Sequence, residues 1–195
     1  MRNSEEIFLA TARTLSENSK VRINFKNGVD KIGKYSDYDI DLKNKKNINR
    51  GTLDYSCFFE RFLQKSFFYS FEPEVENLRN MYKYLHYARA HCLAIIEFPG
   101  VLVNLKTFNR FLLKKKKSVD NPEDLFFFRL YTFCLEKFLN KKMINSLPVN
   151  SDLNLFCKKN LHIIFELKKN LKNHENFSKI SRRLCEKLSK QENQS

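Results

Sequence analysis

The stretch LHYARAHCLAIIEFPGVLVNL, from Leu85 to Leu105, contains no lysine in a chain whose formal net charge is +14. Apolar residues recur at helical spacing in its first part, and Pro99-Gly100 interrupts the pattern before a second apolar run. We interpret the stretch as a buried helix, a sharp turn and a second helix packed back on the first, because buried lysine would lose its hydration without a partner. The turn requires Gly100 if the backbone there is left-handed.

The same periodicity predicts helices on both sides of this stretch. They are expected over about residues 4–15, 52–72, 75–98, 101–113, 122–142, 151–171 and 177–188. Two alternating runs, Val21–Phe25 and Tyr38–Leu42, with a turn at Asn27-Gly28, predict a β-hairpin within about residues 20–42, followed by a polar loop over 43–51. The predicted fold is mainly α, a single domain over 1–195, with about six to seven helices (body about 52–190) and one small β-hairpin near the N-terminus.

The composition supports a packed core, since 42% of the 195 residues are hydrophobic. The positive charge has two explanations, which are an anionic partner or the codon bias of an AT-rich genome. We favour the second, because Lys, Asn, Ile and Phe are abundant together while Gly and Pro are scarce. Five scattered cysteines suit buried thiols in a reducing cytosol. With no signal peptide and no apolar run of roughly 18 residues, we expect a soluble cytoplasmic protein and no membrane partner.

Candidate metal ligands have simpler structural explanations. His86 and His91 are five residues apart on one predicted helix, so they point about 140° apart and cannot share a metal as an i, i+4 pair would. Asp37, Asp39 and Asp41 alternate along a predicted strand. They could face a cation, but the wet side of a half-buried strand explains them more simply.

Catalytic and nucleotide-binding motifs are missing from the sequence. There is no phosphate-binding G-x-x-x-x-G-K-[ST] loop, no G-x-S-x-G elbow and no H-E-x-x-H. Lys114–Lys117 could contact a phosphate backbone, although a solvated segment is the simpler explanation. We therefore expect no catalytic, cofactor-binding or metal-binding residue on this chain.

Several short motifs resemble, in order and spacing, the N-terminal region of the T subunit of aerobic cobaltochelatase (CobT). The pieces are Ala10-Thr11-Ala12-Arg13, Arg50-Gly51-x-x-Asp54, Ala88-Arg89, Gly100-Val101-x-x-Asn104-Leu105, Leu135-Glu136-Lys137, Leu171–Phe177 and Arg182-Arg183-Leu184. The family-motif residues, structural or docking, would be Arg13, Arg50, Gly51, Asp54, Ala88, Arg89, Gly100, Val101, Asn104 and Leu105. Family members continue into an acidic linker and an integrin-like domain, and neither region is in this sequence.

The resemblance implies a non-catalytic subunit. The T subunit joins an AAA+ ATPase S subunit, and the complex works on a large N subunit that inserts Co²⁺ into a corrin ring during cobalamin (vitamin B12) synthesis. ATP, Mg²⁺ and Co²⁺ would be used by those partners, and this chain would act as an adaptor. From its charge alone, we expect nucleic acid binding that is only weak and non-specific. The alternatives are a basic RNA- or DNA-binding helical protein, and a remnant that keeps the fold without a partner.

Overall fold

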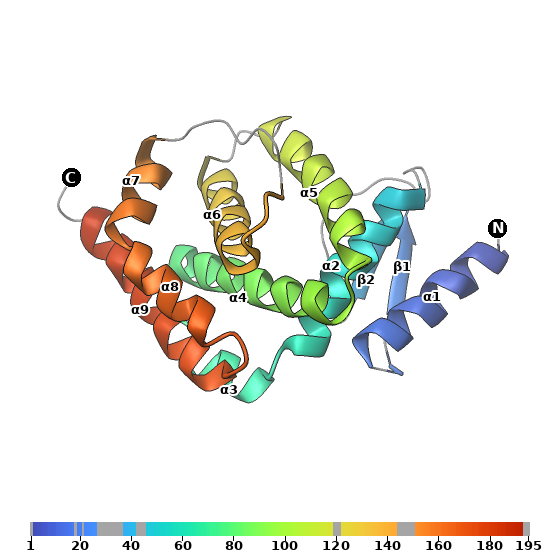
Figure 1. The fold of residues 1–195 in the computed structure, drawn as a ribbon. Helices are drawn as coiled ribbons and strands as arrows, with labels where there is room; N and C mark the ends of the chain where they lie inside the picture. Colours follow the sequence, from blue (N-terminus) through green and yellow to red (C-terminus); the bar gives the residue numbers. More distant parts are fainter. Residues whose placement is uncertain are drawn as a thin grey trace. The chain divides into compact units, whose positions relative to one another are not determined.

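A computed structural model describes residues 2–17, 19–20, 22–26, 37–41, 46–118, 122–143 and 151–192. Across these ranges the chain is mainly helical, with nine helices and two short strands, which confirms the mainly α prediction (Figure 1). The order is α1 (Arg2–Ser16), β1 (Arg22–Lys26), β2 (Asp37–Asp41), α2 (Lys46–Phe62), α3 (Lys65–Ser70), α4 (Glu76–Glu97), α5 (Val101–Ser118), α6 (Pro122–Leu139), α7 (Ser151–Lys159), α8 (Leu161–Lys169) and α9 (His174–Glu192).

The predicted β-hairpin is wrong. Strands β1 and β2 pair in parallel, with Ile23 opposite Tyr38 and Phe25 opposite Ile40, whereas the two strands of a hairpin are antiparallel. Period-two alternation indicates which residues form a strand, but it does not indicate which way the strand runs. The antiparallel direction was predicted from a turn at Asn27-Gly28, and these two residues lie outside the described residues. The same register matches the acidic positions of β2 with Arg22, Asn24 and Lys26 of β1.

Two helices predicted as continuous are each divided in the structure. The helix expected over 52–72 is α2 followed by α3, and α2 begins at Lys46, inside the segment predicted as a loop. The helix expected over 151–171 is α7 followed by α8. Asn160 lies between them with a non-helical backbone (φ −110°, ψ 17°), and its side-chain amide donates to the carbonyl of Phe156. No proline or glycine marks either division, so the sequence gives no breaker signal there.

The chain packs as two compact units, each built from two separate segments. The first unit is Met1–Phe62 with Ala94–Lys114, and the second is Leu63–Leu93 with Lys115–Ser195. The first boundary follows the last residue of α2, and the other two fall inside α4 and α5. The single domain over 1–195 stays a prediction, because separate packing units can still unfold together.

Arg61, in the last turn of α2, organises the first unit around the Pro99-Gly100 turn. Its guanidinium forms ion pairs with Glu17, 3.0 Å away, and Glu97, 2.9 Å away. It also lies 4.9 Å from the centre of the Phe98 ring, a separation typical of a cation–π contact. The Phe98 ring stacks in turn on buried Phe58, with 5.5 Å between ring centres. These contacts fix the chain where α4 ends and α5 begins.

The second unit has an aromatic interior. Its fully buried rings include Tyr82 of α4, Phe128 and Tyr131 of α6, and Phe177 of α9. The Tyr82 hydroxyl donates to the carbonyl of Phe68 at 3.0 Å, so its polar end is satisfied inside the core.

All five cysteines are buried and free, which confirms the prediction of buried thiols. In the described ranges, no helix combines the length and the apolar character needed to cross a bilayer.

Candidate functional site

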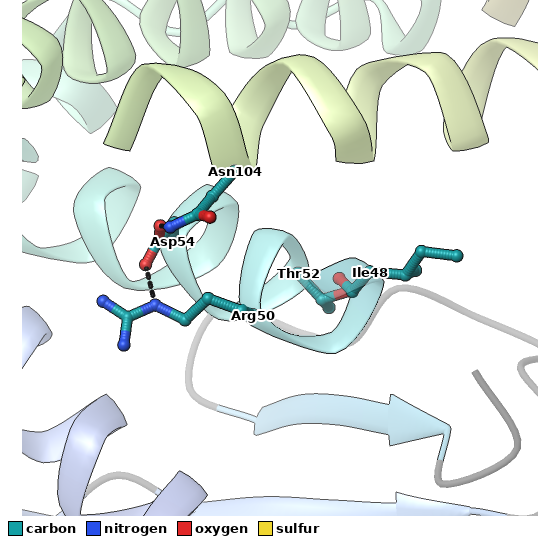
Figure 2. A network of polar contacts seen from close by, with 5 residues as sticks. All are labelled: Ile48, Arg50, Thr52, Asp54 and Asn104. Atoms are coloured by element: carbon teal, nitrogen blue, oxygen red, sulfur yellow. Dashed lines mark hydrogen bonds and ion pairs between the residues drawn. The ribbon is translucent and has the colours of Figure 1, made fainter. Parts of the chain in front are cut away.

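The most connected set of predicted site residues begins with an i, i+4 pair on α2. Arg50 and Asp54 lie one turn apart on the same helix face. The Arg50 Nε donates to Asp54 Oδ1 at 2.9 Å (Figure 2). The Asp54 side chain is fully buried, whereas that of Arg50 is 40% exposed. This pair therefore places a carboxylate in the core with a cation at its solvent side.

Helix α5 supplies the partner for the other carboxylate oxygen. The Asn104 side-chain amide donates to Asp54 Oδ2 at 2.7 Å. Figure 2 shows Asn104 reaching from α5 toward Asp54 on α2. The predicted motif Arg50-Gly51-x-x-Asp54 and the predicted motif around Asn104 are thus joined in one network.

Gly51 makes this close approach of the two helices possible. A Cβ atom at this position would lie 2.6 Å from the Cβ of Phe108 and 2.7 Å from the carbonyl oxygen of Asn104. One turn further along α2, the Tyr55 ring packs edge-on against Phe108, with 5.3 Å between ring centres. Only a residue without a side chain fits under α5 here, and Asn104 can then reach Asp54.

Burial dominates the electrostatics of this network. Removal of water raises the pKa of Asp54, while the hydrogen bond from Asn104 and the charge and hydrogen bond of Arg50 lower it. Because the carboxylate is buried and both of its oxygens accept hydrogen bonds, it has no access to a substrate. The arrangement can hold α2 against α5, but it offers no free base or ligand.

A second pair of predicted motifs meets in the second unit. Arg89 of α4 is buried, and its Nε donates to the carbonyl of Leu171 at 2.8 Å. Its guanidinium carbon also lies 5.8 Å from the centre of the Phe177 ring. Burial lowers the pKa of Arg89 to about 10. The Ala88-Arg89 motif therefore contacts the Leu171–Phe177 motif, and Ala88 itself is fully buried.

The remaining predicted site residues are not brought into either set of contacts. Arg13 is exposed on α1, while Val101 and Leu105 are buried on α5. Gly100 does not adopt the left-handed conformation suggested by the sequence, and a Cβ atom there would meet nothing within 4 Å. The turn at Pro99-Gly100 therefore does not need glycine for its backbone angles or for space.

Two histidines that the sequence did not pair lie together in the second unit. His174 Nε2 is 3.3 Å from His86 Nδ1, and the backbone N–H of Gln64 donates to His174 Nδ1 at 2.9 Å. Since Nδ1 of His174 accepts, its proton is on Nε2 and points to His86. The Nε2 of His86 is then protonated, and it is buried without a hydrogen-bond partner among the described residues. The two residues are 88 positions apart in the chain, and no local signal links them.

Both histidines of this pair are neutral. Burial, followed by the charges of His174 and Arg89, lowers the pKa of His86 well below its usual value. Burial and then Arg89 lower the pKa of His174 to about 3. His91 lies apart from the pair and bonds through Nδ1 to the hydroxyl of Tyr131 at 2.9 Å. His86 and His91 therefore have separate structural environments, as the sequence indicated.

Nothing in the described part of the chain gathers three or more His, Cys, Asp or Glu side chains into a possible metal site. No protein-family model, curated protein or solved structure matches this chain. The contacts define a helical protein in which buried Asp54, Arg89 and His174 bond to segments that are distant in sequence.

The hydrogen bond from Asn104 gives a direct test of this network. Replacing Asn104 by alanine should lower the free energy of unfolding by about 1–3 kcal/mol, because it leaves one oxygen of buried Asp54 unpaired. Chemical denaturation followed by circular dichroism measures the change. In an Asp54→Ala background, the same substitution should lower the free energy of unfolding much less. If the two single losses of stability simply add in the double variant, the two side chains do not interact.

Proposed function

We propose that this chain is a non-catalytic cytoplasmic adaptor, of the cobaltochelatase T-subunit type, that docks an AAA+ S subunit to a large metal-inserting N subunit. One observation carries the proposal. Segments around Asp54 and Asn104, which each resemble a T-subunit motif and are 50 positions apart in the chain, share one buried network. If the two segments resembled the family motifs only by chance, nothing would lead them to contact each other in the fold.

The chemistry of the motif residues supports a structural role rather than a catalytic one, as expected for a non-catalytic subunit. Asp54 and Arg89 are both buried, and each makes a hydrogen bond to another helix or to the segment before one. They are therefore used to fix the fold. ATP, Mg²⁺ and Co²⁺ are assigned to the partner subunits, which would carry out hydrolysis and metal insertion.

The test is co-purification of the full chain with the S subunit encoded in the same genome, with and without ATP. We expect the two to elute together, and ATP to change the fraction bound. In parallel, labelled RNA and DNA are titrated at low and near-physiological salt. We expect nucleic acid binding to be weak and lost on adding salt. Tight nucleic acid binding at physiological salt, with no S-subunit binding, would replace the adaptor proposal with a nucleic-acid-binding function.

A further inference from the structure

Helix α5 has a second face that its packing on α2 does not use. Its inner face buries Val101, Leu105, Phe108 and Leu112. On the opposite side, residues at helical spacing form a row that we name the α5 outer stripe, which consists of Val103, Lys106, Arg110 and Lys114. Val103 is 68% exposed, Arg110 and Lys114 are exposed, and Lys106 is half-buried. The whole stripe belongs to the first compact unit.

The charge of this stripe is not balanced. Helix α5 contains six lysines or arginines and no aspartate or glutamate. Within the described ranges, Lys106, Arg110 and Lys114 form no ion pair.

Helix α9 is also basic, but three of its cations lie in ion pairs. Lys179 pairs with Glu175 at 2.6 Å and Arg182 with Glu186 at 3.1 Å, each one turn away on α9. Arg183 pairs with Glu166 of α8. In the α5 outer stripe, by contrast, all three cations are without an ion pair among the described residues.

The helix dipole accounts for part of the charge but not for the stripe. Cations in the last turn stabilise the C-terminus of a helix, and this effect fades within that turn. It covers Lys115, which lies beside the stripe. Lys106 and Arg110 lie further back in a helix that ends at Ser118, so the dipole gives no reason for them.

We propose that the α5 outer stripe docks an acidic amphipathic helix of a partner protein. Lys106, Arg110 and Lys114 recur every four residues, which spaces them about 6 Å apart along the axis. Carboxylates at i, i+4 and i+8 on a partner helix have the same spacing. Exposed Val103, at one end of the stripe, supplies an apolar contact for the same helix. The proposal goes beyond the cobaltochelatase role, because it uses only the charge and spacing of α5.

Nucleic acid fits this stripe less well. Single strands stack their bases on exposed aromatic rings, and the α5 outer stripe has none. The phosphates of a duplex would pair with the cations of the stripe, but Val103 would stay exposed to water. The hydroxyl of Thr107, beside the stripe, already donates to the carbonyl of Val103 at 3.0 Å, so it is not free to contact a phosphate.

The test uses a fluorescent helical peptide with glutamates at i, i+4 and i+8 and a leucine one turn beyond, titrated with the full chain at low and near-physiological salt. We expect binding that weakens at least tenfold in the neutral triple variant Lys106→Gln, Arg110→Gln, Lys114→Gln. Glutamine is a good helix former at all three positions, and circular dichroism checks the fold. Val103→Ser should weaken binding several-fold while leaving its salt dependence unchanged.

The matched control is Lys158→Gln, Lys159→Gln, Lys169→Gln, which removes the same charge from exposed positions of α7 and α8. It should bind the peptide as the unchanged chain does. Equal weakening by both triple variants would mean that net charge alone drives binding, and would overturn the proposal. So would the absence of peptide binding, or RNA or duplex DNA binding that is tighter than the peptide and is lost with the stripe.

Discussion

Replacing Gly51 by alanine is expected to lower the free energy of unfolding by about 1–3 kcal/mol, the usual result of overpacking a close contact. Alanine normally stabilises a helix relative to glycine by about 1 kcal/mol. A loss of stability therefore indicates overpacking at this contact, whereas a gain would indicate that helix propensity dominates. The added methyl would meet the Cβ of Phe108 at 2.6 Å and the carbonyl oxygen of Asn104 at 2.7 Å. Neither atom can rotate away, so α2 and α5 would have to separate.

The matched control is Gly100→Ala, because a methyl group there meets no atom within 4 Å and the backbone is not left-handed. Its free energy of unfolding should stay within about 0.5 kcal/mol of the unchanged chain. The midpoint of chemical denaturation, followed by far-ultraviolet circular dichroism since the chain has no tryptophan, compares the two. A stabilised Gly51→Ala variant would contradict the close approach of the two helices.

The second expected result is a loss of stability in mild acid caused by the buried histidine pair. In the unfolded chain a histidine has a pKa near 6.5, whereas in the folded chain burial lowers that of His174 to about 3. Protons therefore favour the unfolded state. This contribution to stability is complete above about pH 6.5 and falls as the pH decreases toward 3. At pH 5, His174 alone should lower the free energy of unfolding by about 2 kcal/mol, and His86 acts in the same direction.

Two histidine variants separate this effect from general acid sensitivity. His174→Gln removes one titrating group and keeps an acceptor for the Gln64 N–H, so its stability should change less between pH 7 and pH 5. His162→Gln replaces an exposed histidine of α8 and is the control for the chemical change from histidine to glutamine itself. Burial raises the pKa of Asp54, which acts in the opposite direction and is common to all three proteins. If the free energy of unfolding falls equally between pH 7 and pH 5 in His174→Gln and in the unchanged chain, the histidine pair is not buried and neutral.

Periodicity predicted most of the helices well. Helix α4 was expected over 75–98 and spans Glu76–Glu97, and the break before α5 falls where Pro99-Gly100 placed it. Apolar spacing is a local property of the chain, so it can be read without knowing the fold. The strand direction and the division at Asn160 depend on packing and on single hydrogen bonds, which explains why both were missed.

The polar contacts between helices could not be predicted from the sequence. The Asp54–Asn104 bond joins residues 50 apart, and the His86–His174 contact joins residues 88 apart. Their pairing depends on how helices cross, which periodicity does not specify. The motif resemblance singled out Asp54 and Asn104 separately without indicating that they touch. His174 lies within the Leu171–Phe177 piece, but nothing in that piece indicates a contact with His86.

The discontinuous first unit has a consequence for synthesis on the ribosome. Residues up to Phe62 leave the ribosome well before Ala94–Lys114, the segment that completes the unit. At about 5–20 residues per second, translation from Phe62 to Lys114 takes roughly 3–10 s. During that interval the nascent α2 has neither Asn104 for its carboxylate nor Phe108 over Gly51. The apolar side of α2 is then open to chaperones and to other nascent chains, and folding of the N-terminal part must wait for α5 to emerge.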